Sequence, residues 1–171
     1  GQHNMMNALA AIAAARHAGV PVKVSIEALR DFKSVKRRME LKACINNISI
    51  YDDFAHHPTA IAASVAALRA KVGKQRIIAV TDLRSNTMKL GIHQKTILPA
   101  LEKADINLIH KPAAANWEFD NINQQQVSLY LETDDLLKDL LQLLKPDDQV
   151  LIMSNGSFDG IHQKLITALT G

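Results

Sequence analysis

The chain has 171 residues, of which 47% are hydrophobic and 22% are charged, and its formal net charge is +3 at pH 7. These are ordinary globular values, and the length suits one α/β domain with a sizeable core plus a small appendage. The small net charge argues against a nucleic-acid partner, and the sequence contains no long apolar segment that would indicate a membrane partner. The single cysteine, Cys44, excludes an internal disulfide.

The first predicted elements are two helices. The alanine-rich segment 4–18 predicts a helix that ends at Gly19, because glycine readily adopts the conformation that follows a helix. The pair Pro21-Val22 is typical of a linker. Ser25 can then cap a short helix over residues 26–32.

The rest of the chain is predicted to alternate between strands and helices. Segments 39–44 and 48–51 read as two strands joined by a tight hairpin at Asn46-Asn47. After a helix over 58–71, the remaining strands are predicted at 76–81, 106–110, 127–131 and 149–153, and the remaining helices at 94–103, 134–144 and 161–169, with an irregular stretch around Trp117. This order predicts a doubly wound, mostly parallel, Rossmann-like α/β sheet with an amino-terminal antiparallel hairpin.

The junction at residues 51–59 (YDDFAHHPT) combines acids, imidazoles and a proline that suits the first position of a helix. The free N–H groups of a first helical turn attract phosphate, and Asp53 could accept hydrogen bonds from ribose hydroxyls. The alternative is a turn in which Asp52 and Asp53 cap backbone donors and the histidines are solvated. From these residues alone, both interpretations stay open.

Polar loops follow three predicted strands. They carry Asp53, then Asp82 with Arg84, and then Ser154 with Asn155. Ligands of open α/β sheets bind beyond the carboxyl ends of the strands, so these loops predict one site at one edge of the sheet.

Three segments resemble motifs of the Mur ligase family, the ATP-dependent amide-forming enzymes of peptidoglycan synthesis. Residues 1–11 (GQHNMMNALAA) are similar to Gly-x-His-Asn-x-x-Asn-Ala-Leu-Ala-Ala, residues 38–40 (RME) to Arg-x-Glu, and residues 52–59 to Asp-Asp-Tyr-x-His-His-Pro-Thr. Segments 83–91 (LRSNTMKLG) and 153–162 (MSNGSFDGIH) are most similar to the members that recycle cell-wall tripeptide.

The resemblance implies roles for individual residues. Nucleotide contacts are implied for Asn4, Asn7, Arg38 and Asp53, and a catalytic position facing the phosphates for His56. Contacts with the incoming amine substrate and its carboxylates are implied for Arg84, Ser85, Asn86, Asn155 and Ser157. We expect Arg37 and Lys36 to be solvated and His57 to cap the helix, and we assign no role to His93, His110 and His162. No metal site is predicted from His56 and His57, because adjacent side chains diverge.

The resemblance also implies an activity and a domain arrangement. Members of this kind join UDP-N-acetylmuramate to L-alanyl-γ-D-glutamyl-meso-diaminopimelate in the cytoplasm, using ATP and Mg²⁺. Residues 1–22 resemble the last helix and linker of the family's central ATPase domain, and residues 23–171 its carboxyl-terminal domain. The sequence contains no Gly-x-x-x-x-Gly-Lys-Ser/Thr phosphate loop. We therefore expect a carboxyl-terminal piece, inactive alone, whose partners include the amino-terminal and central domains and whose magnesium ligands lie mostly in the central one.

Two other functions are consistent with the sequence. One is the carboxyl-terminal domain of a UDP-N-acetylmuramate:L-alanine ligase, which shares the acid-histidine motif but differs in the loop that carries Arg84. The other is a doubly wound module that binds a nucleotide or a carboxylate without catalysis.

Overall fold

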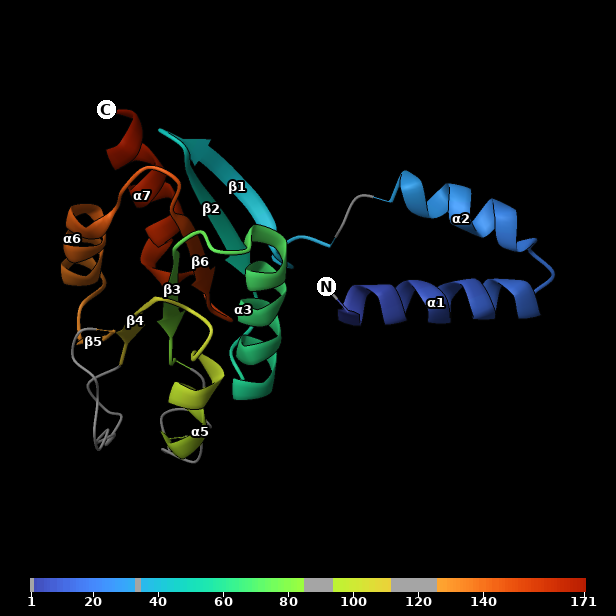
Figure 1. Ribbon diagram of the computed structural model, residues 1–171, viewed down its shortest axis with the longest axis horizontal. Helices are drawn as coiled ribbons and strands as arrows, with labels where there is room; N and C mark the ends of the chain where they lie inside the picture. Colours follow the sequence, from blue (N-terminus) through green and yellow to red (C-terminus); the bar gives the residue numbers. More distant parts are fainter. Residues whose placement is uncertain (1, 33–34, 85–93, 112–125) are drawn as a thin grey trace. The chain divides into compact units, whose positions relative to one another are not determined.

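The computed structural model describes residues 2–32, 35–84, 94–111 and 126–171 (Figure 1). The chain forms two compact units, Gly1–Lys36 and Arg37–Gly171. No helix of the described residues is long and apolar enough to cross a membrane.

The first unit consists of α1 (Gln2–His17) and α2 (Val22–Arg30). The predicted end of the first helix is confirmed, since Gly19 follows it with φ of +89°, a conformation that other residues rarely adopt. The predicted cap at Ser25 and the linker at Pro21-Val22 are wrong. The helix α2 begins directly after Pro21, whose carbonyl accepts the N–H of Ser25, so Ser25 lies inside the helix.

The second unit is built on a six-stranded sheet in the order β1-β2-β6-β3-β4-β5. Its strands are β1 (Glu40–Ile45), β2 (Ile48–Asp53), β3 (Ile77–Asp82), β4 (Ile106–His110), β5 (Val127–Tyr130) and β6 (Gln149–Met153). Among these described strands the β1–β2 pair is antiparallel, and the other four pairs are parallel. Asn46 and Asn47 join β1 to β2 with φ of 51° and 65°, as a two-residue hairpin requires, so the predicted hairpin is confirmed.

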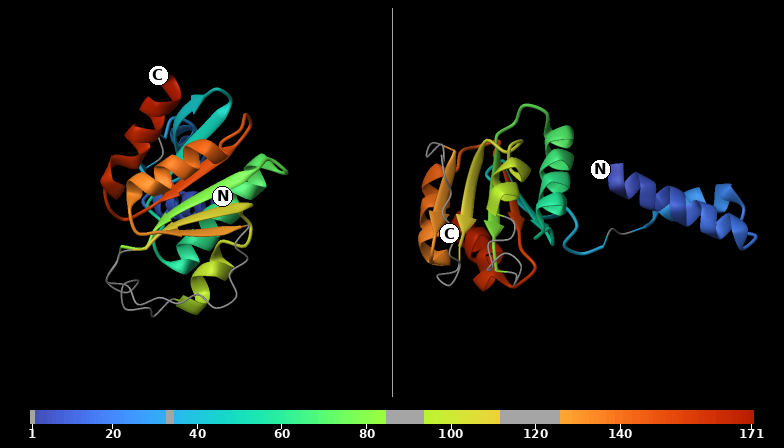
Figure 2. Two further views of the ribbon diagram at one scale, coloured as in Figure 1. Left: turned by 90° about the vertical axis from the view of Figure 1, so that its left-hand side faces the viewer. Right: turned by 90° about the horizontal axis from the view of Figure 1, so that it is seen from below.

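Helices cover both faces of this sheet, which confirms the predicted doubly wound fold (Figures 1 and 2). The helices α3 (Pro58–Val72) and α5 (Gln94–Ala100) lie on one face, where Ile61, Val65 and Ile97 pack against Ala79 and Leu151. On the other face lie α6 (Thr133–Leu143) and α7 (Ile161–Thr170), which is preceded by the short turn η1 (Phe158–Gly160).

The second face has its own core, in which Leu136 and Leu165 pack against Ile50, Val80 and Ile152. The central strands are buried along their whole length because both of their faces are covered. The helix predicted over 94–103 ends at Ala100, after which the N–H groups of residues 101 and 102 donate three residues back instead of four. The predicted irregular stretch around Trp117 lies outside the described residues.

Candidate substrate and nucleotide site

A row of polar side chains lies at the carboxyl ends of four neighbouring strands, on the face covered by α6 and α7. Each comes two residues after a core residue of that face, and successive side chains of a strand alternate between faces. The row consists of Asp52 after Ile50, Ser154 after Ile152, Asp82 after Val80 and His110 after Leu108, and all four polar residues are buried. Hydrogen bonds join Ser154, Asp82 and His110 within this row, whereas Asp52 belongs to a second cluster around Arg37, and the predicted Asp53 is not part of the row.

Asp82 is the centre of this row. Its side chain is fully buried, and His110 Nδ1 lies 2.9 Å from Oδ1. The other oxygen, Oδ2, accepts a hydrogen bond of 3.0 Å from Ser154 Oγ and lies 3.0 Å from Arg84 Nε. A buried carboxylate needs such partners, because desolvation without them would be costly.

His110 connects the row to β5. Its Nε2 lies 3.2 Å from the Leu131 carbonyl oxygen, so both ring nitrogens have an oxygen partner. The hydrogen bond to Asp82 raises the pKa of His110 above its ordinary 6.5, and the charge of Asp82 and the Leu131 carbonyl add to this, against the opposing effects of burial and of Arg84. The sequence assigned His110 no role, whereas the structure makes it the partner of a buried acid.

The raised pKa of His110 predicts a stability that falls as pH rises. A histidine whose folded-state pKa exceeds its unfolded value stabilises the fold fully below the unfolded pKa, and this contribution is lost as pH rises through the folded pKa. We expect the urea midpoint of the Arg37–Gly171 unit to drop as the pH rises above the ordinary histidine pKa of 6.5, and His110→Gln to flatten this dependence. His57, which is exposed in the same unit, provides the control: a flattening by His57→Gln as large as that by His110→Gln would contradict the assignment.

Arg84 joins the row to the turn before α7. Its side chain is one third exposed, and Nη2 lies 3.4 and 3.5 Å from the two carboxylate oxygens of Asp159. Thr133 Oγ1, at the start of α6, donates a hydrogen bond of 2.7 Å to Asp159 Oδ2. This hydrogen bond is the main reason that the pKa of Asp159 is lowered, and the charge of Arg84 lowers it further.

The backbone that carries Asp159 is strained. Phe158, Asp159 and Gly160 have φ of 47°, 49° and 70°, three successive left-handed residues. This conformation costs roughly 1–2 kcal/mol for each residue other than glycine. Phe158 is fully buried in the core, and its packing offsets part of the cost. Such strain is typical of functional positions.

Arg37 organises a second cluster, so the expectation that it is solvated is wrong. Its Nη2 donates to the carbonyl oxygens of Ser154 and Gly156, its Nε lies 3.5 Å from Asp52 Oδ1, and its guanidinium lies 5.0 Å from the centre of the Phe54 ring. Asp52 and Phe54 lie within twenty positions of the arginine and Ser154 and Gly156 more than a hundred positions away, and no local pattern reveals such contacts. Lys36, by contrast, is exposed as expected.

Asp52 faces His162 as well as Arg37. His162 Nε2 lies 3.2 Å from Asp52 Oδ1, but its angle is unsuitable for a hydrogen bond, and we treat the contact as electrostatic. Burial alone would raise the pKa of Asp52. The contacts with His162 and Arg37 outweigh burial, so the pKa is lowered and the carboxylate is charged at neutral pH.

Arg38 and Asp53, which are both predicted to contact the nucleotide, differ in accessibility. Arg38 is exposed and has no hydrogen bond or ion pair to any described residue. Asp53 is buried, and its two oxygens accept hydrogen bonds of 2.8 Å from the backbone N–H groups of Met39 and Ala55. Asp53 therefore fixes the backbone next to Arg38, and its contact with ribose stays a prediction.

The start of α3 has the predicted form. Pro58 is its first residue, and His57 precedes it and accepts a hydrogen bond of 3.4 Å from the Thr59 N–H, which confirms the predicted cap. His56 is half-buried, with Nδ1 3.0 Å from the Phe54 carbonyl oxygen and its ring edge-on to that of Phe54. Its predicted catalytic position is consistent with this partial exposure and stays a prediction.

The remaining predicted site residues lie in different parts of the chain. Asn155 is half-buried and Ser157 exposed in the loop after β6, and Arg84 lies close to this loop: a Cβ built on Gly156 would be 3.5 Å from Arg84 Cδ. Arg84, Asn155 and Ser157 thus share one edge of the sheet. Asn4 and Asn7 are exposed on α1 of the first unit. Ser85 and Asn86 lie outside the described residues.

Five residues of this site were not assigned to it from the sequence: His110, Asp159 and Thr133 around Arg84, and Arg37 and His162 in the second cluster. A usable signal existed for His110, because Asp82 and His110 end consecutive predicted strands of a parallel sheet. Asp159 lies just before α7 and Thr133 is the first residue of α6, and nothing local in the sequence indicates that they meet.

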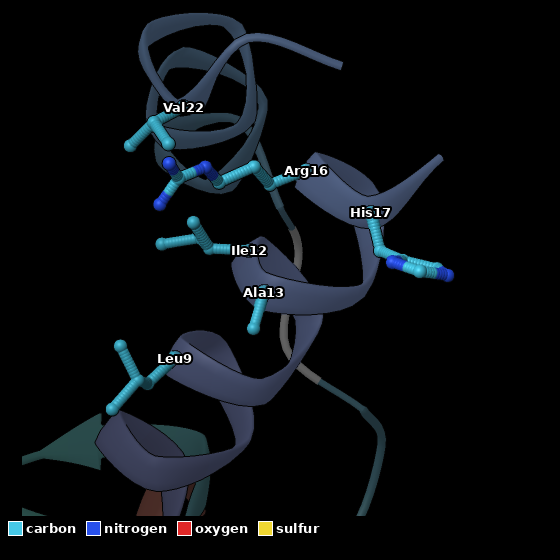
Figure 3. A pocket seen from close by; sticks show the side chains of 6 residues that line it. All are labelled: Leu9, Ile12, Ala13, Arg16, His17 and Val22. Carbon is cyan, nitrogen blue, oxygen red and sulfur yellow. The ribbon is translucent and has the colours of Figure 1, made fainter. Parts of the chain in front are cut away.

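Two further features lie elsewhere. An open groove on the first unit is lined by side chains of α1 and α2, including Leu9, Ile12 and Val22; Figure 3 shows the Arg16 guanidinium beside Ile12 and Val22, with His17 pointing away. None of its lining residues is a predicted contact. Within the described ranges, no group of three or more His, Cys, Asp or Glu residues is placed to hold a metal ion.

Residues 37–156 match the family described as Mur ligase, glutamate ligase domain. Over 99% of the chain and 38% of each relative, the chain is 49% identical to a UDP-N-acetylmuramate–L-alanyl-gamma-D-glutamyl-meso-2,6-diaminoheptandioate ligase of Haemophilus influenzae and 46% identical to that of Escherichia coli. It is 36% identical to a UDP-N-acetylmuramate–L-alanine ligase of Persephonella marina, over 92% of the chain and 37% of the relative. The chain thus spans about two fifths of the length of these relatives.

Solved structures agree in fold. A murein peptide ligase of Psychrobacter arcticus has a TM-score of 0.76 and 42% identity, over 99% of this chain and 37% of that one. A domain of a putative ligase of the same tripeptide from Haemophilus ducreyi has a TM-score of 0.62 and 45% identity, over 77% of this chain and 99% of that one. The family match and relatives of this similarity show that the chain belongs to the Mur ligase family and carries its glutamate ligase domain.

Proposed function

We propose that this chain is part of an ATP-dependent ligase that joins UDP-N-acetylmuramate to the recycled tripeptide L-alanyl-γ-D-glutamyl-meso-diaminopimelate. The observation that carries the proposal is the 49% and 46% identity, over 99% of the chain, to two relatives named for this reaction. The relative named for L-alanine addition is 36% identical. Because the chain covers 38% of the first relatives, the activity belongs to the whole protein.

The part of the site around Arg84 would receive the tripeptide. A guanidinium is a planar fork that pairs with a carboxylate through two parallel hydrogen bonds, and the tripeptide offers several carboxylates. Arg84 is partly exposed, and Asn155 and Ser157 lie in the neighbouring loop with accessible side chains. Ser85 and Asn86 extend the same segment of the sequence, and we keep them in the proposed tripeptide site.

The part of the site around Arg38 would receive ATP, which supplies the phosphoryl group that activates the carboxylate. The residues present suit a nucleotide: Arg38 is an exposed cation without a partner among the described residues, and the first turn of α3 offers backbone N–H groups near His56. Asp53 would place Arg38 through its bond to the Met39 N–H and meet the ribose. Asn4 and Asn7 would contact the adenine.

The other parts of the proposal follow from the family. We infer that residues 1–22 end the central ATPase domain and that the enzyme works in the cytoplasm. The central domain would hold most of the Mg²⁺ ligands, and the amino-terminal domain would hold the UDP-sugar. The 171 residues purified alone would then fold without ligating, because the sequence has no phosphate-loop motif.

A ligase assay of the full-length protein tests this function. The enzyme should consume ATP and form the amide with UDP-N-acetylmuramate when the tripeptide is the amine substrate, and should use free L-alanine much less well. Preference for free L-alanine would favour the L-alanine ligase, and no amide with either amine would favour a binding module.

Arg38→Ala should weaken the use of ATP in the full-length enzyme. Losing a hydrogen bond to a charged group costs about 1.5–3 kcal/mol, so we expect the KM for ATP to rise roughly 10- to 150-fold. The KM for the tripeptide should change little. Lys36→Ala, which removes an exposed cation two residues away, is the control. Equal ATP kinetics in Arg38→Ala and the control would show that Arg38 is only a solvated side chain.

A further inference from the structure

Asp159 lies beside the proposed tripeptide site, and the function proposed above gives it no part. It is placed by two features that do not depend on Arg84. Three successive positive φ angles turn the backbone there, and Thr133 Oγ1, from a residue that is 5% exposed, donates to its Oδ2 at 2.7 Å. Asp159 is therefore a fixed carboxylate toward which Arg84 can orient.

The contacts of Arg84 fall on one side of its guanidinium. Nε lies 3.0 Å from the buried Asp82, and Nη2 lies 3.4 and 3.5 Å from the oxygens of Asp159. The contact at Nε alone would leave the guanidinium plane of Arg84 free to rotate about that atom. The second contact, with the Asp159 carboxylate, restrains this rotation. Among the described residues Nη1 has no hydrogen bond or ion pair, so the outer end of the fork remains for a ligand there.

The Arg84–Asp159 pair is poorly suited to stabilise the fold. The side chains are 34% and 50% exposed, and their closest contact is 3.4 Å. Exposed ion pairs of this kind contribute little to stability, because water screens them. The pair adds little to the stability of the fold, so the strained turn is better explained by the orientation that Asp159 gives to Arg84.

We propose that Asp159 is a positioning residue that aims the Arg84 guanidinium at a carboxylate of the amine substrate. The proposal rests on the proposed tripeptide ligase function. Thr133 takes part by holding Asp159. Asp82 anchors the inner side of the guanidinium, Asp159 sets its direction, and the substrate carboxylate meets the remaining N–H groups.

The test is steady-state kinetics of the full-length ligase with Asp159→Asn, which keeps the shape and removes the charge. We expect the KM for the tripeptide to rise about two- to fivefold, the range that an exposed ion pair supports, with the KM for ATP and the urea midpoint unchanged. Thr133→Val should give the same shift, and Thr133→Ser, which keeps the hydroxyl, should restore wild-type values. Asp134→Asn is the control, because Asp134 pairs with Lys164 at 2.6 Å on the surface.

A double-mutant cycle shows whether Asp159 acts through Arg84. In an Arg84→Ala background, Asp159→Asn should cause no further change in the KM for the tripeptide. A further rise of the KM in that background would overturn the proposal. An unchanged or lower KM in the Asp159→Asn single variant would also overturn it, and a lower value would mean that Asp159 competes with the substrate. If the wild-type enzyme does not ligate the tripeptide, the proposed function itself fails, and that outcome is visible before any variant is made.

Discussion

Replacing Arg84 by alanine should cause the largest loss of tripeptide use. The variant loses the charged fork for the substrate carboxylate, and a hydrogen bond to a charged group is worth about 1.5–3 kcal/mol. We therefore expect the KM for the tripeptide to rise roughly 10- to 150-fold, with the KM for ATP little changed. Initial rates measured at varied tripeptide and saturating ATP, and the reverse, separate the two effects.

Two further variants sharpen this experiment. Arg84→Lys should restore activity only partly, because an ammonium group is a point charge and cannot replace the planar fork held by Asp82 and Asp159. Lys74→Ala removes an exposed cation elsewhere in the second unit and should leave both constants unchanged. A rise confined to the KM for ATP in Arg84→Ala would assign this edge to the nucleotide instead.

Replacing Asp82 by alanine should destabilise the Arg37–Gly171 unit most. Asp82 is 1% exposed, and its removal leaves His110 and Ser154 without their buried acceptor. Breaking a buried charged pair costs about 3–5 kcal/mol. Urea unfolding of the unit, followed by circular dichroism, measures the loss, and the Haemophilus ducreyi domain solved by itself supports the use of the separate unit.

The matched control for this variant is Asp134→Ala. Asp134 also accepts from a cation, Lys164, but its side chain is 80% exposed, so its loss should change the unfolding free energy by less than about 1 kcal/mol. Equal midpoints for Asp82→Ala and Asp134→Ala would mean that the row beyond the strands adds nothing to stability.

Local patterns in the sequence were sufficient for the architecture. The runs at 77–80 and 150–153 are apolar because both faces of those strands are covered, and Asn46-Asn47 forms the hairpin because asparagine tolerates positive φ. The parallel order then places the polar loops at one edge. The cap at Ser25 failed because Pro21 was taken as a linker, whereas it immediately precedes the helix.

Only the tertiary structure decided which polar side chains meet. Asp82 bonds with His110, 28 residues away, and with Ser154, 72 residues away, and Arg84 faces Asp159 across 75 residues. The contacts with Ser154 and Asp159 arise because β6 inserts between β2 and β3, an order that no local periodicity specifies, whereas the contact with His110 follows from the pairing of β3 with β4. The sequence by itself determined the strands, the hairpin and the edge that carries the site. The tertiary structure decided that Arg37 is bound by the loop after β6 and that Arg84 lies between two carboxylates, because both depend on contacts between distant segments.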